Sequence, residues 1–179
     1  MHQVSLLWSG GLDSTIMLQF FLSSARYRVK CYHILIRNGC GKDIREAKAI
    51  KSLLPLFEKH PNFSFEEIKH RIRPCDDRNL KMINLIKDST PIAIGTLRID
   101  DFGNYPTTDG DDIYLTEKSG VKIITWDTLG LHTFGEIYAL GLKLLGRANL
   151  GKTWSCQLWW KKPCGNCYSC KRRMRLLGL

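Results

Sequence analysis

The sequence predicts an α/β protein with a doubly wound parallel sheet and a small metal-binding segment after it. Three observations lead to this prediction: strand-like and helix-like segments alternate, a glycine turn joins the first strand to the first helix, and four cysteines lie close together near the C-terminal end. Alternation of β and α segments favours a parallel sheet that helices cover on both faces. Right-handed crossovers between the strands then give the doubly wound order.

Hydrophobic spacing assigns the individual elements. Short apolar runs predict strands at residues 3–8, 29–36, 91–95 and 121–125, and alternation of apolar and polar residues predicts a strand at 63–68. Apolar residues at helical spacing predict helices at residues 13–25, 43–59, 77–87 and 133–145. Ligands of such sheets bind beyond the carboxyl ends of the strands. We therefore expect one rim of the sheet to gather the segments that follow strands, at residues 9–14, 37–41, 100–112 and 126–132.

Length and composition describe a globular protein. The 179 residues, 44% of them hydrophobic, suit one α/β domain at residues 1–149 followed by a small subdomain at residues 150–179. No apolar run approaches the roughly 18–20 residues that span a membrane. The first residues have no basic stretch ahead of their apolar run, as a secretory signal would have. These observations predict a cytoplasmic protein without a membrane partner.

The net charge of +10 is distributed unevenly. Residues 1–136 contain all 17 acidic residues and 18 of the 27 Lys and Arg residues, a balance of +1, so the other nine basic residues lie after Glu136. A basic C-terminal region indicates an anionic partner such as a nucleic acid, a nucleotide or an anionic substrate. A solvated basic surface without a partner is the alternative.

Four of the seven cysteines form a compact pattern. They are Cys156, Cys164, Cys167 and Cys170, separated by seven, two and two residues. Such short spacings let four thiolates converge on one cation and predict a closed structural Zn²⁺ site. An iron–sulfur cluster is the main alternative, and four unligated buried cysteines are the other. The odd total of seven argues against a secreted disulfide framework.

A glycine loop follows the first predicted strand and reads Ser9-Gly10-Gly11-Leu12-Asp13-Ser14. The two glycines let the backbone pass close to phosphate oxygens, and the following helix offers unpaired N–H groups and a positive dipole end. The serines add hydroxyl donors, and Asp13 is placed to orient the loop or to help hold Mg²⁺. The Walker loop and the dinucleotide fingerprint are both excluded, because the required lysine and the third glycine are absent. An ordinary glycine turn capped by Asp13 or Ser14 is the alternative.

The glycine loop resembles the PP-loop of the ATP pyrophosphatases, which cleave ATP between its α- and β-phosphates. Together with the cysteines, other segments resemble the 7-cyano-7-deazaguanine synthase (QueC) family: Arg78-Asn79-Leu80, a stretch with Asp101, Tyr105 and Asp109, Glu136-Ile137, and Thr153-Trp154-Ser155-Cys156. The matching segments are short but extend from residue 9 to residue 173. The resemblance implies a Rossmann-like sheet of the PP-loop ATPase type with a C-terminal zinc-binding subdomain.

This resemblance implies a reaction in queuosine precursor biosynthesis. The family converts 7-carboxy-7-deazaguanine and ammonia to 7-cyano-7-deazaguanine with ATP and Mg²⁺, through an adenylated carboxylate and an amide. The protein then contributes positioning and charge stabilisation more than covalent catalysis. The family commonly forms homodimers, and the apolar helix at residues 133–145 is a candidate interface.

The resemblance also implies roles for individual residues. The implied ATP-binding residues are Ser9, Gly10, Gly11, Leu12, Asp13 and Ser14. The implied catalytic residues are Asp13, Ser14 and Arg78. The implied substrate residues are Arg78, Asn79, Asp101, Tyr105 and Asp109. Lys152 and Arg173 are further candidates to approach an anionic group, and the four cysteines would hold the zinc.

Two differences from the family pattern leave other functions open. Residues 37–42 read Arg-Asn-Gly-Cys-Gly-Lys where the family usually carries Asp-Tyr-Gly-Gln-x-His, and the lysine of the family's Leu-Thr-Lys is absent before Glu136. The alternatives are an enzyme that stops at the amide, a divergent PP-loop enzyme that modifies a nucleic acid or a protein, and a nucleotide-binding module without turnover.

Overall fold

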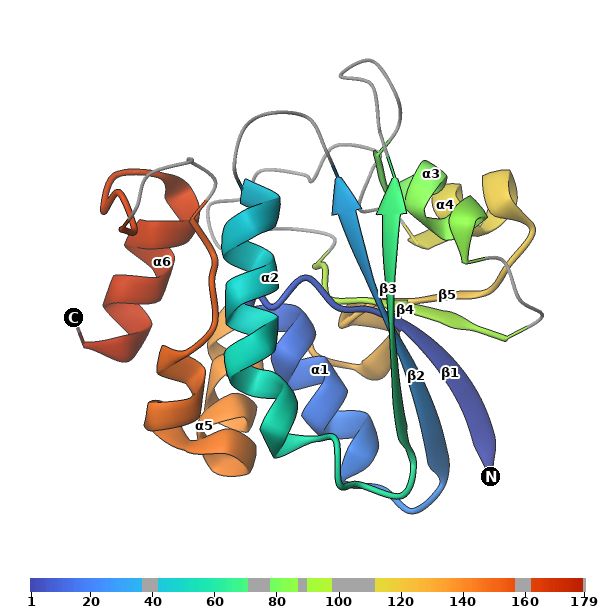
Figure 1. The fold of residues 1–179 in the computed structure, drawn as a ribbon, viewed down its shortest axis with the longest axis horizontal. Coiled ribbons are helices and arrows are strands. Elements are labelled where there is room, and N and C mark those ends of the chain that lie inside the picture. The colour runs from blue at the N-terminus through green and yellow to red at the C-terminus, as the bar shows by residue number, and fades with distance from the viewer. Residues whose placement is uncertain (37–41, 71–77, 87–89, 98–111, 157–161, 179) are drawn as a thin grey trace.

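A computed structural model describes residues 1–36, 42–70, 78–86, 90–97, 112–156 and 162–178. Its centre is a five-stranded sheet with the order β3-β2-β1-β4-β5, in which all neighbouring strands run parallel (Figure 1). The predicted parallel α/β architecture is therefore confirmed. The strands are β1 (His2–Leu7), β2 (Tyr27–Ile36), β3 (Phe63–His70), β4 (Ile92–Ile94) and β5 (Ile123–Ile124).

Helices cover both faces of the sheet, as the doubly wound order requires. Helices α1, α2 and α5 lie on one side of the strands, and α3 and α4 lie on the other (Figure 1). Helix α6 lies beside α5, away from the sheet. The described helices are α1 (Leu12–Leu22), α2 (Lys42–Leu53), α3 (Arg78–Leu85), α4 (Asp112–Ser119), α5 (Phe134–Gly151) and α6 (Tyr168–Leu177).

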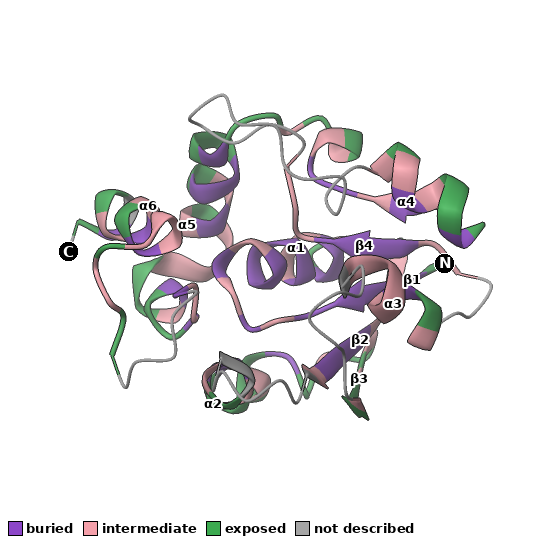
Figure 2. Cartoon of the chain, turned by 90° about the horizontal axis from the view of Figure 1, so that it is seen from above, coloured by how far each residue is buried: buried purple, intermediate pink, exposed green. Residues whose placement is uncertain are grey.

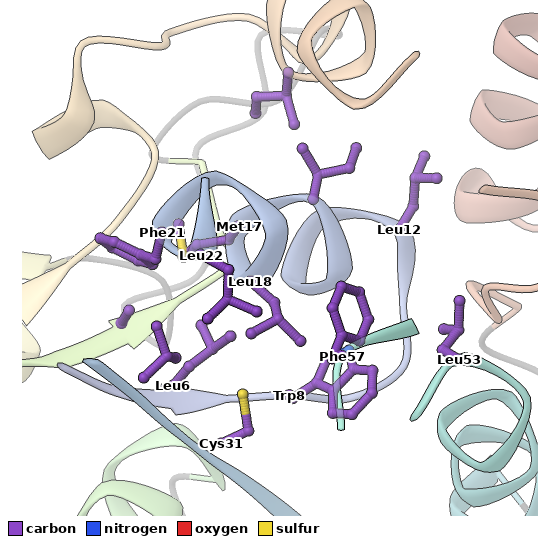
Figure 3. Close-up of a cluster of buried hydrophobic side chains, with 14 of the residues drawn as sticks. Leu6, Trp8, Leu12, Met17, Leu18, Phe21, Leu22, Cys31, Leu53 and Phe57 are labelled. Atoms are coloured by element: carbon purple, nitrogen blue, oxygen red, sulfur yellow. The ribbon is translucent and has the colours of Figure 1, made fainter. Parts of the chain in front are cut away.

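Successive residues of the central strand β1 pack into two separate hydrophobic cores. Leu6 belongs to the core beneath α1, where Figure 3 shows it near Leu18 and Phe21. Leu7 belongs to the core on the opposite face, together with Ile83 of α3 and Leu115 of α4. Because both faces of β1 are covered, its last four residues are all buried, and Figure 2 shows the central strands coloured as buried. This explains why the second half of the strand is mostly apolar rather than alternating.

The strand order reverses beside β1. The chain moves outward from β1 to β2 and β3, and then returns to the opposite side of β1 to form β4 and β5. Leu6 of β1 is thus aligned with Cys31 on one side and with Ala93 on the other. The carboxyl ends of β1 and β4 therefore border the topological switch point, which is the usual binding crevice of open α/β sheets.

Several helices differ in extent from the prediction. Helix α1 ends at Leu22, before residue 25, and α2 ends at Leu53, where a 3₁₀ turn at Leu54–Leu56 replaces the predicted continuation. Pro55 explains the change in α2, because proline has no N–H to continue an α-helix. Helix α5 extends six residues beyond the predicted end at 145, with a kink at Gly146. The apolar spacing predicted neither α4 nor α6, and the division of the chain at residue 150 stays a prediction.

No helix in the described ranges is both long enough and apolar enough to cross a membrane. This finding agrees with the sequence, in which no apolar run of that length occurs.

Helix α5 begins at a capping box. The Thr133 hydroxyl oxygen accepts a hydrogen bond from the Glu136 backbone N–H at 3.2 Å, and Glu136 Oε2 accepts one from the Thr133 N–H at 2.8 Å. The Thr133 hydroxyl also donates to Glu136 Oε2 at 2.9 Å. This hydroxyl contact, followed by the backbone donors, lowers the pKa of Glu136.

We expect Thr133→Ala to raise the pKa of Glu136 toward its ordinary value, because the variant loses the hydroxyl donor. A lowered carboxyl pKa stabilises the fold above the ordinary pKa, and this stabilisation is lost as the pH falls through the lowered pKa. The difference in unfolding free energy between wild type and variant should therefore shrink on acidification. Titration of Glu136 by NMR and denaturant unfolding at several pH values measure both effects. An unchanged Glu136 pKa in the variant would contradict this account.

Candidate functional site

The glycine loop, residues 9–14, joins the carboxyl end of β1 to the first turn of α1. Gly10 has a positive φ of 70°, and a Cβ atom at this position would lie 2.9 Å from the Glu46 carbonyl oxygen of α2. The Gly10 carbonyl oxygen accepts a hydrogen bond from the Trp154 N–H at 2.9 Å. Only glycine combines this backbone conformation with such close packing, so the loop backbone is held between α2 and the segment before Cys156.

The two loop serines bind each other and the loop backbone. Their hydroxyl oxygens are 3.1 Å apart, and Ser9 Oγ accepts from the Gly11 N–H at 3.2 Å. Ser14 Oγ accepts from the Ser9 N–H at 3.3 Å. Gly11 is the N-cap residue of α1, but no side chain caps the helix there. The loop therefore presents hydroxyl groups beside a helix N-terminus, an arrangement suited to an anion.

The end of strand β4, at Gly95, packs closely against the first turn of α1, at Ser14. A Cβ atom on Gly95 would lie 2.7 Å from the Ser14 backbone nitrogen and 2.8 Å from its Cα atom. Backbone atoms cannot move aside as a flexible side chain can, so this position needs glycine. The close approach brings the switch point between β1 and β4 directly against the glycine loop.

A cavity of about 230 Å³ lies at this point, beyond the carboxyl ends of β1, β2 and β4. It is lined by residues of the glycine loop, of α2 and α3, and of the strand ends. The segment that carries the four cysteines, called the cysteine-containing segment here, also lines it, with residues between Trp154 and Arg172. The lining includes Ser9, Gly11, Leu12, Asp13, Ser14, His33, Glu46, Asn79, Gly95, Thr96, Trp154, Ser155, Ser169 and Arg172.

The cavity brings together part of the predicted site. Six predicted residues line it, namely Ser9, Gly11, Leu12, Asp13, Ser14 and Asn79. Gly10 supports the loop from behind, since its α-carbon faces α2. The backbone of Arg78 begins α3, next to Asn79. The predicted substrate residues Asp101, Tyr105 and Asp109 lie outside the described residues.

Trp154 and Arg172 are two of the cavity residues that sequence reasoning did not assign to the site. Trp154 lines the cavity, and its Nε1 donates to the Cys156 carbonyl oxygen at 3.1 Å, so the cysteine-containing segment orients the indole. Arg172 lines it from α6 and donates from Nη2 to Asp13 Oδ2 at 2.7 Å. Trp154 belongs to the segment Thr153-Trp154-Ser155-Cys156, whose resemblance to the 7-cyano-7-deazaguanine synthase family was a signal that could have identified it as a site residue. No local pattern separates Arg172 from its basic neighbours.

Arg173 does not take the predicted position near an anionic group. Its guanidinium donates to the carbonyl oxygens of Leu150, Gly151 and Thr153, and to the Thr153 hydroxyl at 2.7 Å. These carbonyls belong to the C-terminal end of α5, where helical partners are lacking and cations are favoured. Burial lowers the pKa of Arg173, whose side chain instead joins α6 to α5. Lys152, the other candidate, is exposed and donates to Asn149 Oδ1 at 3.0 Å.

The four predicted cysteine ligands do converge. All four Sγ atoms of Cys156, Cys164, Cys167 and Cys170 lie within 4.8 Å of one another, and none forms a disulfide. The sulfurs of Cys164 and Cys170 are 3.9 Å apart, and those of Cys156 and Cys167 are 4.0 Å apart. Zn–S bonds of about 2.3 Å in a tetrahedron place sulfurs about 3.8 Å apart. The cluster can therefore hold a metal ion such as zinc.

The surroundings of the sulfurs favour thiolates unequally. The Cys167 N–H donates a hydrogen bond to Cys164 Sγ at 3.2 Å. The pKa of Cys164 is lowered to about 6, and this hydrogen bond is the largest cause. Burial raises the pKa of Cys170 to about 12 in the absence of a cation. A divalent ion would reverse this penalty by binding the deprotonated sulfur. Cys167 is the N-cap residue of α6, so the cluster also determines where that helix begins.

No protein-family model matches the chain, and no curated protein matches it either. One similar solved structure is a predicted subunit of tRNA methyltransferase from Methanocaldococcus jannaschii DSM, which is 19% identical over 70% of this chain and 67% of that chain, with a TM-score of 0.41. A similarity at this level carries no conclusion about activity.

We expect the purified chain to bind one zinc ion, and metal binding to weaken as the pH falls, because protons compete for the four thiolates. Elemental analysis gives the stoichiometry, and the thiolate-to-metal absorption of the cobalt-substituted chain reports the ligands. Cys170→Ser should reduce this absorption, whereas Cys31→Ser, which alters a buried cysteine outside the cluster, should preserve it. Iron with inorganic sulfide in the purified chain would contradict a zinc site.

We expect Gly95→Ala to lower the free energy of unfolding by about 1–3 kcal/mol, the usual cost of forcing extra atoms into a packed region. The added methyl group would press on the Ser14 backbone. Gly135→Ala is a matched control, because a Cβ there meets only the Thr133 hydroxyl oxygen, at 4.0 Å. Denaturant unfolding measures both variants. Equal stability of Gly95→Ala and wild type would show that the close approach is not a constraint.

Proposed function

We propose that the chain is an ATP-dependent carbon–nitrogen ligase of the PP-loop type that acts as a 7-cyano-7-deazaguanine synthase. The observation that carries this proposal is the position of the glycine loop. It lies at the switch point of a parallel sheet, next to a cavity that the cysteine-containing segment also lines. The PP-loop motif and the cysteine pattern are the two features that led from the sequence to this family, and both contribute to one site.

The site's chemistry supports binding of a triphosphate. Backbone N–H groups at the start of α1 and the hydroxyl groups of Ser9 and Ser14 are suitable donors to phosphate oxygens. Asp13 is the loop carboxylate that would hold Mg²⁺, which when bound neutralises part of the triphosphate charge. The residues act by orienting ATP so that its α-phosphorus faces the substrate carboxylate.

The cavity also offers contacts for a flat heterocycle. The Trp154 ring is available for stacking against the deazaguanine, and its orientation is set by the hydrogen bond to the Cys156 carbonyl. Asn79 lines the same cavity and can donate to and accept from the polar edge of a base. The substrate carboxylate would then attack the α-phosphate, pyrophosphate would leave, and ammonia would displace AMP to give the amide. A second activation and dehydration would give the nitrile.

A macromolecular acceptor is the second candidate function. Two observations favour it. Four lysines of α5 and the C-terminal segment are exposed, and no acidic residue follows Glu136 in the sequence. Exposed cations without neighbouring acids attract polyanions such as nucleic acids. These lysines are Lys143, Lys152, Lys162 and Lys171.

One assay distinguishes these functions. The zinc-loaded chain is incubated with ATP, Mg²⁺, ammonium and 7-carboxy-7-deazaguanine, and AMP and the deazaguanine products are followed by mass spectrometry. Formation of the nitrile with AMP is the expected result. An amide without nitrile would indicate an enzyme that stops after the first activation. AMP that appears only when RNA, DNA or protein is added would favour the second candidate, and nucleotide binding without AMP in every mixture would contradict both.

We expect Asp13→Ala to lower the rate of AMP formation by about a hundredfold or more, a typical loss when a group that supports charge in the transition state is removed. The zinc content should not change, because Asp13 is not one of the converging ligands, which are all cysteines. Glu117→Ala is the control, since this exposed carboxylate on α4 does not line the cavity. Wild-type turnover by Asp13→Ala would exclude the glycine loop as the ATP site.

A further inference from the structure

The cysteine-containing segment forms a wall of the cavity. Four of its residues, Trp154, Ser155, Ser169 and Arg172, line the same space as the glycine loop. Two hydrogen bonds join them: the Trp154 N–H donates to the Gly10 carbonyl oxygen at 2.9 Å, and the Leu12 N–H donates to the Ser155 side-chain Oγ at 3.5 Å. The segment is therefore part of the site rather than a separate attachment.

Arg172 is held firmly in this wall. Its Cζ atom lies 3.5 Å from the centroid of the Phe134 ring and 5.3 Å from that of the Tyr168 ring, and its side chain is 17% exposed. Phe134 is itself buried at the first position of α5. Stacking on aromatic rings fixes the plane of a guanidinium and lowers the entropy that it loses on binding a ligand.

The charges around the cavity give Arg172 a distinct role. Among the described residues that line it, Arg172 is the single Lys or Arg side chain, whereas Asp13 and Glu46 are carboxylates. A polyphosphate would be repelled by these carboxylates without a nearby cation. Of the planar guanidinium's five N–H donors, those on Nη2 bind Asp13, and no other hydrogen bond of Arg172 is made within the described part of the chain. Donors therefore remain for an anion.

The neighbouring basic residues of α6 do not compete for this role. Arg173 is bound to the carbonyl oxygens at the end of α5. Lys171 and Arg175 are exposed and do not line the cavity. Successive residues of a helix point about 100° apart, so only one of the adjacent arginines can face the glycine loop.

We propose that Arg172 binds the phosphates of the nucleotide directly and is the cation that the metal-binding segment supplies to the glycine loop. This inference rests on the proposed ATP-dependent function and adds a residue to its phosphate site. The cysteine cluster sets the first turn of α6, and Arg172 follows Cys170 by two residues. A metal ion held by the cluster would thus fix the turn of α6 that carries Arg172.

The test compares Arg172→Gln with Arg175→Gln in the zinc-loaded full chain. Binding of ATP, AMP and adenosine is measured by calorimetry. Arg172→Gln should weaken ATP binding about ten- to a hundredfold, the usual effect of losing a charge-assisted hydrogen bond, and should leave adenosine within about twofold of wild type. Arg175→Gln should bind all three as wild type does. Arg172→Lys should be intermediate, because it keeps the charge but loses the planar fork.

A second comparison separates direct binding from simple neutralisation of Asp13. If Arg172 contacts phosphate, Arg172→Gln should still weaken ATP binding when introduced into the Asp13→Asn variant. An effect that disappears in this background would overturn the inference, as would equal losses for ATP and adenosine or unchanged ATP affinity in Arg172→Gln. A wild-type chain that binds no ATP would overturn the proposed function and this inference with it.

Discussion

The site depends on close backbone packing around the glycine loop. Gly10 lies against the α2 backbone, Gly95 at the end of β4 lies against Ser14, and Trp154 binds the Gly10 carbonyl oxygen. Each contact comes from a different part of the chain, and two of them leave no room for a side chain. Because the loop is held from three sides, its hydroxyl groups and the N-terminus of α1 have fixed positions before any ligand binds. Such preorganisation is what phosphate recognition requires.

The cysteine cluster contributes to the same site through α6. It sets the start of that helix, Arg173 joins the helix to the end of α5, and Arg172 reaches Asp13. Among the described C-terminal cations, Arg172 and Arg173 are thus engaged inside the fold, and Arg147 donates to the Leu177 carbonyl oxygen. The net positive charge of the C-terminal region therefore overstates the charge that is available to a partner. The exposed lysines remain as the part of that charge that solvent and any macromolecule would meet.

Local patterns predicted much of the fold. The strands were predictable because most of them read as short apolar runs, as buried parallel strands do, whereas β3 alternates between apolar and polar residues. The length of α2 was overestimated, since apolar spacing continues past Pro55 although the helix does not. Helix α6 was missed because its cysteines and arginines mask any apolar periodicity. What positions α6 is the cysteine cluster and the packing of Arg173, and neither contributes to a hydrophobic pattern.

The sequence by itself determined the chemistry of the glycine loop and the convergence of the four cysteines, because both depend on residues within a few positions of one another. Only the tertiary structure decided that Asp13 meets a residue 159 positions away, and that this residue is Arg172 rather than Arg173. That choice follows from how α5 and α6 pack, which determines which face of α6 is turned toward the loop. Interactions of this range depend on the whole fold, so no local spacing can encode them.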